Sequence, residues 1–208
     1  MKHNPFSTRK TAPGQIPFIF DKDCDFLSKN DIEFCALYNL LAKSEYRSQI
    51  LGAHGTGKST FLAGFVPILE DHGHRVHWVS LHDRQRRLPQ EFWQRQQELA
   101  GSFAEKPPIV IVDGYEQLSW METWKLSRWV RKTGSGLLIT SHGRIRHFPV
   151  LFRTKADPDV LRCVIELLFR DQSGVEPPDW PLCLSLFECH QGNLRNVMFD
   201  LYDHYETT

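Results

Sequence analysis

Short apolar segments alternate along the chain with segments whose apolar residues recur at helical spacing. The apolar segments predict strands at residues 47–51, 75–81, 109–112, 137–140 and 150–153. The helical patterns between and around them predict helices at residues 31–43, 60–71, 89–99 and 116–132. The run at 109–112 (IVIV) is apolar throughout, which is typical of a central parallel strand covered on both faces. Strands that alternate with helices predict an α/β fold with a parallel sheet wrapped by helices.

The pattern changes near residue 156, after which only helical spacing is found. Helices are predicted at residues 160–169, 182–190 and 194–205. The first residues, 1–15, are polar and contain Pro and Gly, so they predict a flexible or loosely docked arm. We therefore expect three parts: an N-terminal arm with a leading helix (1–44), an α/β core (45–156) and a small C-terminal helical subdomain (157–208).

Composition argues against several classes of protein. Lys and Arg number 25, and so do Asp and Glu, so the net charge is zero. This balance argues against a broadly basic nucleic-acid binder and leaves open only a local patch. The 5 cysteines form no CxxC pair and their number is odd, which favours reduced thiols and a cytoplasmic location. No apolar run approaches the roughly 18 residues that a membrane span needs, so no membrane insertion is expected.

Residues 52–60 (GAHGTGKST) match the phosphate-loop pattern GxxxxGK[ST], and they follow a predicted strand and open a predicted helix. The glycines let the backbone curl so that successive amides face phosphate oxygens, and the helix N-terminus adds its partial positive charge. Lys58 is expected to reach the β- and γ-phosphates, Ser59 to ligate Mg²⁺ and Thr60 to support the start of the helix. The expected nucleotide-binding residues are Gly52, Ala53, His54, Gly55, Thr56, Gly57, Lys58, Ser59 and Thr60.

An acidic residue ends the apolar strand at 109–112. Asp113 lies where the carboxyl ends of parallel strands gather ligands, so we expect it to hold the Mg²⁺ water shell, although it could also cap the next helix. The next position is Gly114, where many P-loop ATPases have Glu. Glu116 is therefore the candidate general base, and its alternative role is an acidic first-turn residue favoured by the helix dipole.

Further polar residues follow the later strands and precede the last helix. Thr140 and Ser141 are candidates for sensing the γ-phosphate, with His142 a weaker one; the alternative is a strand cap and turn. Arg195 lies in the first turn of the last helix, where a cation is mildly disfavoured by the helix dipole. A nucleotide phosphate bound to Arg195 would offset this effect; the alternative is that Arg195 is a surface residue.

Other arginines and tryptophans are assigned simpler roles. A basic loop exposed to solvent is the simpler interpretation of Arg144 and Arg146; the alternative is that one of them stabilises transition-state charge. The cluster Arg84, Arg86 and Arg87 is also interpreted as a loop exposed to solvent, and its alternative is a patch for nucleic acid or a partner. The tryptophans of the long predicted helix are expected to pack in the core rather than to form a stacking platform; they are Trp120, Trp124 and Trp129.

Four features in order resemble the AAA+ branch of P-loop ATPases: GAHGTGKST, IVIVD, a strand ending in Thr-Ser, and GNLR on a terminal helix. The resemblance implies a three-layer P-loop NTPase domain whose five-stranded sheet has the order 5-1-4-3-2, with nucleotide bound between this core and a helical lid. It implies Lys58, Ser59 and Thr60 on phosphate and Mg²⁺, and Asp113 on Mg²⁺. It also implies Thr140 or Ser141 as the first sensor and Arg195 as the second. The sequence departs from the pattern at Gly114, and it has no unambiguous arginine finger.

We therefore expect a Mg²⁺-dependent ATPase that couples ATP binding and hydrolysis to movement of its lid or of a protein partner. Two alternatives stay open: a P-loop small-molecule kinase, and a binding module that is controlled by nucleotide but does not hydrolyse it. Nucleic acid as a partner has no support from the net charge.

Overall fold

The computed structural model describes residues 4–19, 26–82, 85–99, 106–170 and 175–207. The chain divides into two compact units. The first comprises Met1–Glu33, Ala53–Gly64 and Thr154–Thr208, and the second comprises Phe34–Gly52 and Phe65–Arg153. The three predicted parts of the chain use different boundaries and stay a prediction.

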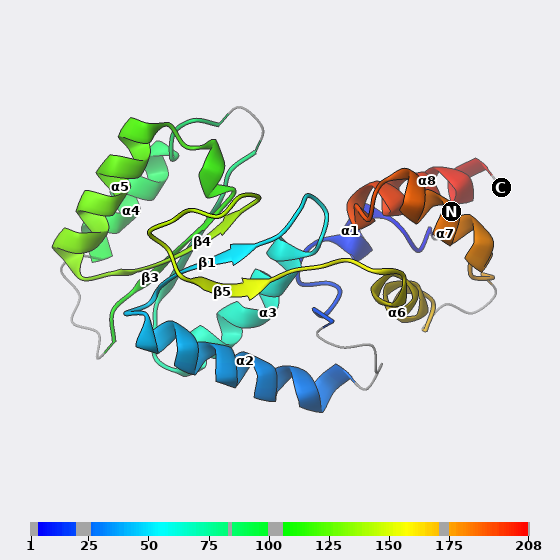
Figure 1. The fold of residues 1–208 in the computed structure, drawn as a ribbon, viewed down its shortest axis with the longest axis horizontal. Coiled ribbons are helices and arrows are strands. Elements are labelled where there is room, and N and C mark those ends of the chain that lie inside the picture. Colours follow the sequence, from blue (N-terminus) through cyan, green and yellow to red (C-terminus); the bar gives the residue numbers. More distant parts are fainter. Residues whose placement is uncertain (1–3, 20–25, 83–84, 100–105, 171–174, 208) are drawn as a thin grey trace. The chain divides into compact units, whose positions relative to one another are not determined.

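The second unit contains a five-stranded sheet in which every paired strand is parallel (Figure 1). Its order is β2-β3-β4-β1-β5, which confirms the expected order 5-1-4-3-2. The strands are β1 (Arg47–Leu51), β2 (Val76–Ser80), β3 (Ile109–Asp113), β4 (Gly136–Ser141) and β5 (Val150–Arg153). All five agree with the sequence prediction to within about one residue at each end.

Helices cover the sheet because its central strands are apolar on both faces. All six residues of β4 are buried, as are the first four of β3. One face packs against α4 (Gln90–Leu99) and α5 (Trp120–Thr133) through a shared core that includes Phe92, Val112, Leu126 and Ile139. On the other side of the sheet, α2 (Phe26–Lys43) contacts α3 (Lys58–Asp71), and the rings of Phe34 and Phe65 stack with centroids 5.6 Å apart.

The helix predicted at 116–132 is two elements instead of one. A short 3₁₀ helix, η1 (Tyr115–Gln117), is followed by extended backbone at Leu118, and α5 begins at Trp120. The physical reason is Ser119, whose hydroxyl accepts a hydrogen bond from the Glu122 amide at 3.3 Å and so caps a new helix. Glu116 therefore lies in the η1 turn and not in the first turn of a long helix.

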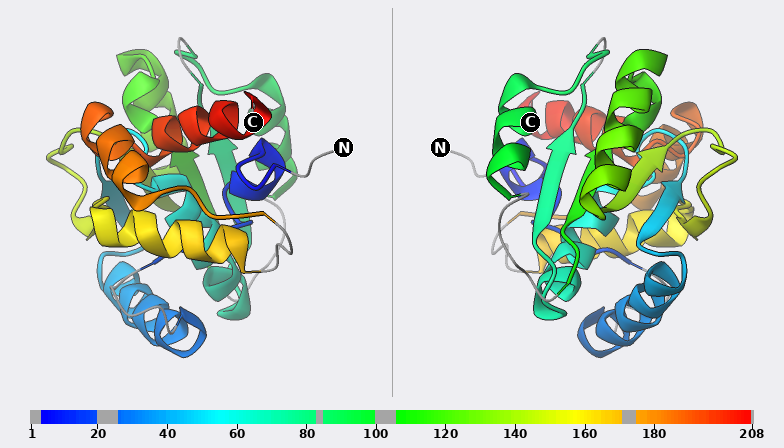
Figure 2. Two further views of the ribbon diagram at one scale, coloured as in Figure 1. Left: turned by 90° about the vertical axis from the view of Figure 1, so that its right-hand side faces the viewer. Right: turned by 90° about the vertical axis from the view of Figure 1, so that its left-hand side faces the viewer.

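The first unit gathers both ends of the chain around one helical core. Its helices are α1 (Thr8–Thr11), α6 (Pro158–Phe169), α7 (Trp180–Cys189) and α8 (Leu194–Thr207), together with the starts of α2 and α3. Phe6 is 2% exposed, and its ring lies 5.7 Å from that of Phe169 and 5.4 Å from that of Tyr205. The Asn4 amide donates to the Tyr202 carbonyl at 3.0 Å. Figures 1 and 2 show α1 beside α8, so the described part of the arm is packed, contrary to the expectation of loose docking.

In the described ranges, no helix combines the length and the apolar character that crossing a membrane requires.

Candidate functional site

The phosphate-loop residues form a tight turn between β1 and α3. Gly55 and Gly57 have φ of 68° and 87°, in the left-handed region that L-residues with side chains avoid. The Lys58 ammonium donates to the Ala53 carbonyl at 2.7 Å, and the Thr56 hydroxyl donates to the same oxygen at 2.9 Å. The loop thus folds back on itself, and its lysine is held against its own backbone.

Residues of the first unit pack closely around this loop. A Cβ added to Gly55 would lie 1.8 Å from the side-chain oxygen of Asn193 and 3.2 Å from the Arg195 amide nitrogen. The Thr56 hydroxyl lies 2.7 Å from that of Thr154. The start of α8, which carries the exposed Arg195, is therefore in contact with the loop. No local signal in the sequence points to the contact of Asn193 with Gly55.

At the carboxyl end of β3, Asp113 is oriented by its neighbour on β4. The buried Thr140 hydroxyl donates to Asp113 Oδ1 at 2.6 Å and accepts a hydrogen bond from the Gly114 amide at 2.8 Å. Ser141, the other sensor candidate, instead directs its hydroxyl to the Gly143 carbonyl at 2.9 Å and to the Gln49 amide oxygen at 3.2 Å. Of the two candidates, Thr140 is the one in contact with Asp113.

Glu116 is linked through a histidine to the first residue of the phosphate loop. His142 Nε2 lies 3.0 Å from Glu116 Oε1, and His142 Nδ1 lies 3.1 Å from the Gly52 carbonyl oxygen. The His142 ring therefore lies between the Glu116 carboxylate and the phosphate loop, at the edge of the sheet where β1 ends. The sequence ranked His142 below Thr140 and Ser141, because one histidine after a strand carries little signal.

The remaining candidates lie away from these contacts. Arg144 and Arg146 are on the exposed loop after β4, and Arg86 and Arg87 are exposed as well. Arg84 lies outside the described residues. Trp129 packs against Phe92 and Trp93 as predicted, with centroids 6.5 and 6.4 Å apart.

The prediction that all three tryptophans of this helix are core residues is wrong for two of them. Trp120 is 77% exposed and Trp124 is 60% exposed. Both lie on the side of α5 that faces away from the sheet, opposite the buried Leu126 and Val130.

The sequence matches no protein-family model and no curated protein. Solved structures do resemble the fold. A DNA replication initiation factor has a TM-score of 0.52 and 13% identity over 85% of this chain. The replication initiator DnaA bound to AMPPCP and single-stranded DNA has a TM-score of 0.50 and 13% identity over 83% of this chain. AMPPCP-bound DnaA from Aquifex aeolicus has a TM-score of 0.50 and 12% identity over 92%.

This chain spans 60 to 63% of the length of those three proteins. At such identities, the likeness concerns the fold and not the reaction. Together with the order of the sheet, it shows that this chain has a P-loop NTPase fold.

Proposed function

We propose that this protein binds ATP through residues 52–60 and hydrolyses it in a Mg²⁺-dependent reaction. The observation that supports the proposal most is the loop itself, which follows β1, opens α3 and has glycines at positive φ on either side of Thr56. A loop of this kind presents backbone amides and a helix N-terminus to phosphate oxygens. The neighbours that contain AMPPCP have the same fold, which agrees with a nucleoside triphosphate as the ligand.

In this proposal, Lys58 leaves the Ala53 carbonyl and neutralises the β- and γ-phosphates. Ser59 and Asp113 are the protein's Mg²⁺ ligands, directly or through water. Mg²⁺ takes oxygen ligands, keeps several waters and needs only one or two carboxylates beside the phosphates, so this small donor set fits the ion. The Thr140 hydroxyl fixes one carboxylate oxygen of Asp113 at 2.6 Å, which limits how that carboxylate can turn. When bound, the ion offsets the negative charge of the phosphates.

The backbone after Asp113 explains why the acidic residue of related ATPases is missing there. Gly114 has a φ of 86°, and a Cβ at this position would lie 3.1 Å from the Leu81 carbonyl oxygen. A glutamate directly after Asp113 is therefore strained in this turn. We assign the water-orienting role to Glu116, whose carboxylate His142 holds at 3.0 Å.

Arg195 is the proposed lid residue that contacts the γ-phosphate. Its amide lies 3.2 Å from the position of a Gly55 Cβ, so the first turn of α8 adjoins the phosphate loop within one unit. An exposed cation at a helix N-terminus gains stability when an anion pairs with it.

The test combines a fluorescent ATP analogue with a phosphate-release assay. Lys58→Ala should lose both binding and release, while Lys43→Ala, which removes an exposed lysine of α2, should change neither. Glu116→Gln should keep nucleotide binding and lose phosphate release by roughly 100-fold or more, the scale of a general-base contribution.

Each other outcome contradicts the proposal. Unchanged ATP affinity in Lys58→Ala would remove the loop from the site. Binding without phosphate release in the wild type would favour the nucleotide-controlled binding module. Turnover that appears only when a small-molecule phosphate acceptor is added would favour the kinase.

A further inference from the structure

The side of α5 that faces solvent has an unusual composition. Its exposed residues are two tryptophans, a methionine and four cations, with no acidic residue; they are Trp120, Met121, Trp124, Lys125, Arg128, Arg131 and Lys132. We call these seven residues the α5 face. In a chain with zero net charge, this one helix face carries four positive charges.

The acidic residue of the same helix is turned away from solvent. Glu122 is 8% exposed, and its carboxylate accepts a hydrogen bond from the Trp93 indole at 3.1 Å. Leu126 and Val130 fill the core side of α5. The tryptophans of the α5 face therefore have no role in the core. Exposed large apolar side chains that gather in one patch mark an interaction surface.

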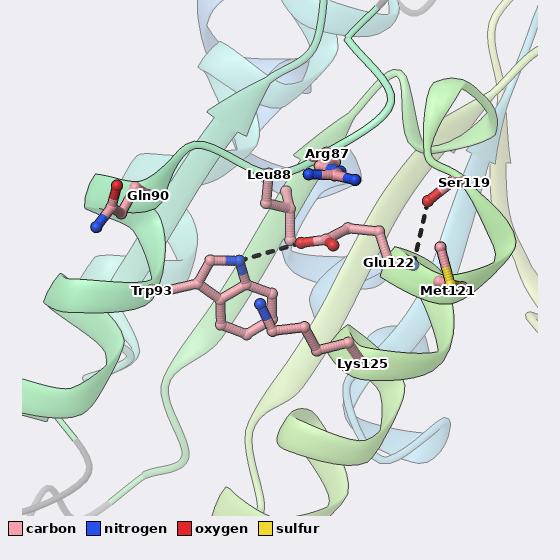
Figure 3. Close-up of a pocket in the computed structure, with 8 residues that line it drawn as sticks. All are labelled: Arg87, Leu88, Gln90, Trp93, Ser119, Met121, Glu122 and Lys125. Atoms are coloured by element: carbon pink, nitrogen blue, oxygen red, sulfur yellow. Dashed lines mark hydrogen bonds between the residues drawn. The ribbon is translucent and has the colours of Figure 1, made fainter.

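Basic residues continue the α5 face beyond the start of the helix. The Ser119 amide donates to the Arg86 carbonyl at 3.0 Å, which ties the Arg86–Arg87 segment to the first turn of α5. A hollow of about 330 Å³ lies there, and Figure 3 shows Arg87, Met121 and Lys125 around it. The cations thus extend from the loop before α4 to the last turn of α5.

The indoles of this region already accept cations on their ring faces. The Lys125 ammonium lies 4.1 Å from the centre of the Trp93 ring, and the Arg128 guanidinium lies 5.8 Å from the centre of the Trp124 ring. Trp120 and Trp124 are one helical turn apart, about 6 Å along the axis, so they lie on the same side of α5. Indole rings beside cations form a surface on which an anionic chain with flat groups can bind. Its flat groups stack on the indoles while its anionic groups pair with the Lys and Arg side chains.

We propose that the α5 face binds single-stranded nucleic acid, an activity separate from the proposed nucleotide hydrolysis. Bases stack on the Trp120 and Trp124 indoles, and phosphates contact the surrounding Lys and Arg side chains. The net charge of zero had argued against nucleic acid, but the charge that matters is local. A duplex fits less well because its bases are already stacked on one another. An acidic peptide would use the cations without needing two exposed indoles.

The test is titration of the full chain with a labelled oligothymidylate of roughly 20 nucleotides, longer than the sites of about 4–16 nucleotides that single-strand binders cover. Trp120→Ala/Trp124→Ala should weaken binding by at least roughly 30-fold, since stacking contributes about fivefold or more per base and two stacking rings are removed. Phe199→Ala removes another large exposed apolar side chain, on α8, and should leave binding unchanged.

Salt dependence tests the phosphate contacts separately. Arg128→Gln/Arg131→Gln should lower the slope of log K against log salt by about 1.4, because each phosphate contact on a single strand contributes about 0.7. Arg9→Gln/Lys43→Gln removes two exposed cations elsewhere and should leave the slope as it was.

The proposal fails if the wild type does not bind the oligonucleotide, or if binding is unchanged in the tryptophan variant. It also fails if the α5 face binds anionic vesicles or a polyglutamate peptide more tightly than the oligonucleotide. Lys58→Ala should keep oligonucleotide binding, because the proposed ATP site and the α5 face are separate. A failure of the proposed ATP site can therefore be distinguished from a failure of the α5 face.

Discussion

Adding a single methyl group to the phosphate loop, by Gly55→Ala, should destabilise the protein through two separate effects. The left-handed backbone at φ 68° costs an L-residue with a side chain about 1–2 kcal/mol. The new Cβ would also lie 1.8 Å from Asn193 Oδ1 and displace that side chain. Asn193 caps α8 by accepting from the Asn196 amide at 3.3 Å, and loss of such a cap costs about 1 kcal/mol. The expected loss in free energy of unfolding is therefore about 2–3 kcal/mol.

Two companion variants separate these effects. Gly134→Ala has nearly the same backbone angle, φ 66°, but nothing lies within 4 Å of its new Cβ, so only the backbone cost of about 1–2 kcal/mol should appear. Asn193→Ala removes the cap alone and should cost about 1 kcal/mol. In Gly55→Ala/Asn193→Ala, the cap is lost only once, so the double variant should be more stable than the sum of the single variants by about 1 kcal/mol.

Urea denaturation of all four proteins measures these values, and affinity for the fluorescent ATP analogue shows whether the loop keeps its shape. Additive costs in the double variant, or equal costs for Gly55→Ala and Gly134→Ala, would refute the inferred contact between the phosphate loop and α8.

Three further outcomes follow from other parts of the structure. Leu126→Ala, at a fully buried position of α5, should lower the free energy of unfolding by about 2–5 kcal/mol in urea denaturation, and a loss below about 1 kcal/mol would contradict the packing described. Thr140→Val leaves Asp113 without its donor and should raise the Mg²⁺ concentration needed for half-maximal turnover, whereas Thr140→Ser should restore it. Burial lowers the pKa of His74. The contribution of the neutral ring to the free energy of unfolding is therefore fully present above about pH 6.5 and should be lost as the pH drops towards the lowered pKa. His74→Gln should flatten that acid-side loss, and an unchanged pH profile would remove His74 as its cause.

The direction of the His74 effect agrees with its hydrogen bonds. His74 Nδ1 lies 2.8 Å from the Pro107 carbonyl oxygen, and Nε2 lies 3.1 Å from the Tyr38 hydroxyl. Lys106 donates to that hydroxyl at 2.9 Å, which leaves the Tyr38 proton to bond with a neutral Nε2. If His74 were protonated, its Nε2–H and the Tyr38 O–H would both be donors facing each other, and the ring would add a second cation near Lys106. Although the Pro107 carbonyl favours the charged ring, burial is the larger effect.

The sheet was predictable from the sequence because its strands are apolar runs of the expected length. The order of the strands came from the resemblance, and the residues of the phosphate loop came from one specific motif. The break at Leu118 was missed because the helical spacing continues across it, and only Ser119, a good helix cap, marked the new start.

The surroundings of the candidate site depend on contacts between distant segments. Nothing near Gly55 in the sequence indicates Asn193, and nothing near Glu116 indicates His142. The exposure of Trp120 and Trp124 has a signal in the sequence: at helical spacing they share a side with Arg128 and Arg131, which favours solvent over the core.

The packing of Phe6 and Asn4 against α6 and α8 sets an order for folding during synthesis. The second unit ends at Arg153, so every strand of its sheet has been made before the C-terminal helices are translated. The first unit joins Asn4 to Tyr202 and cannot complete its core until residue 202 has left the ribosome. At synthesis rates of about 5–20 residues per second, the roughly 200 residues between Phe6 and Tyr205 take about 10–40 seconds to make, and chaperones can bind Phe6 in that period.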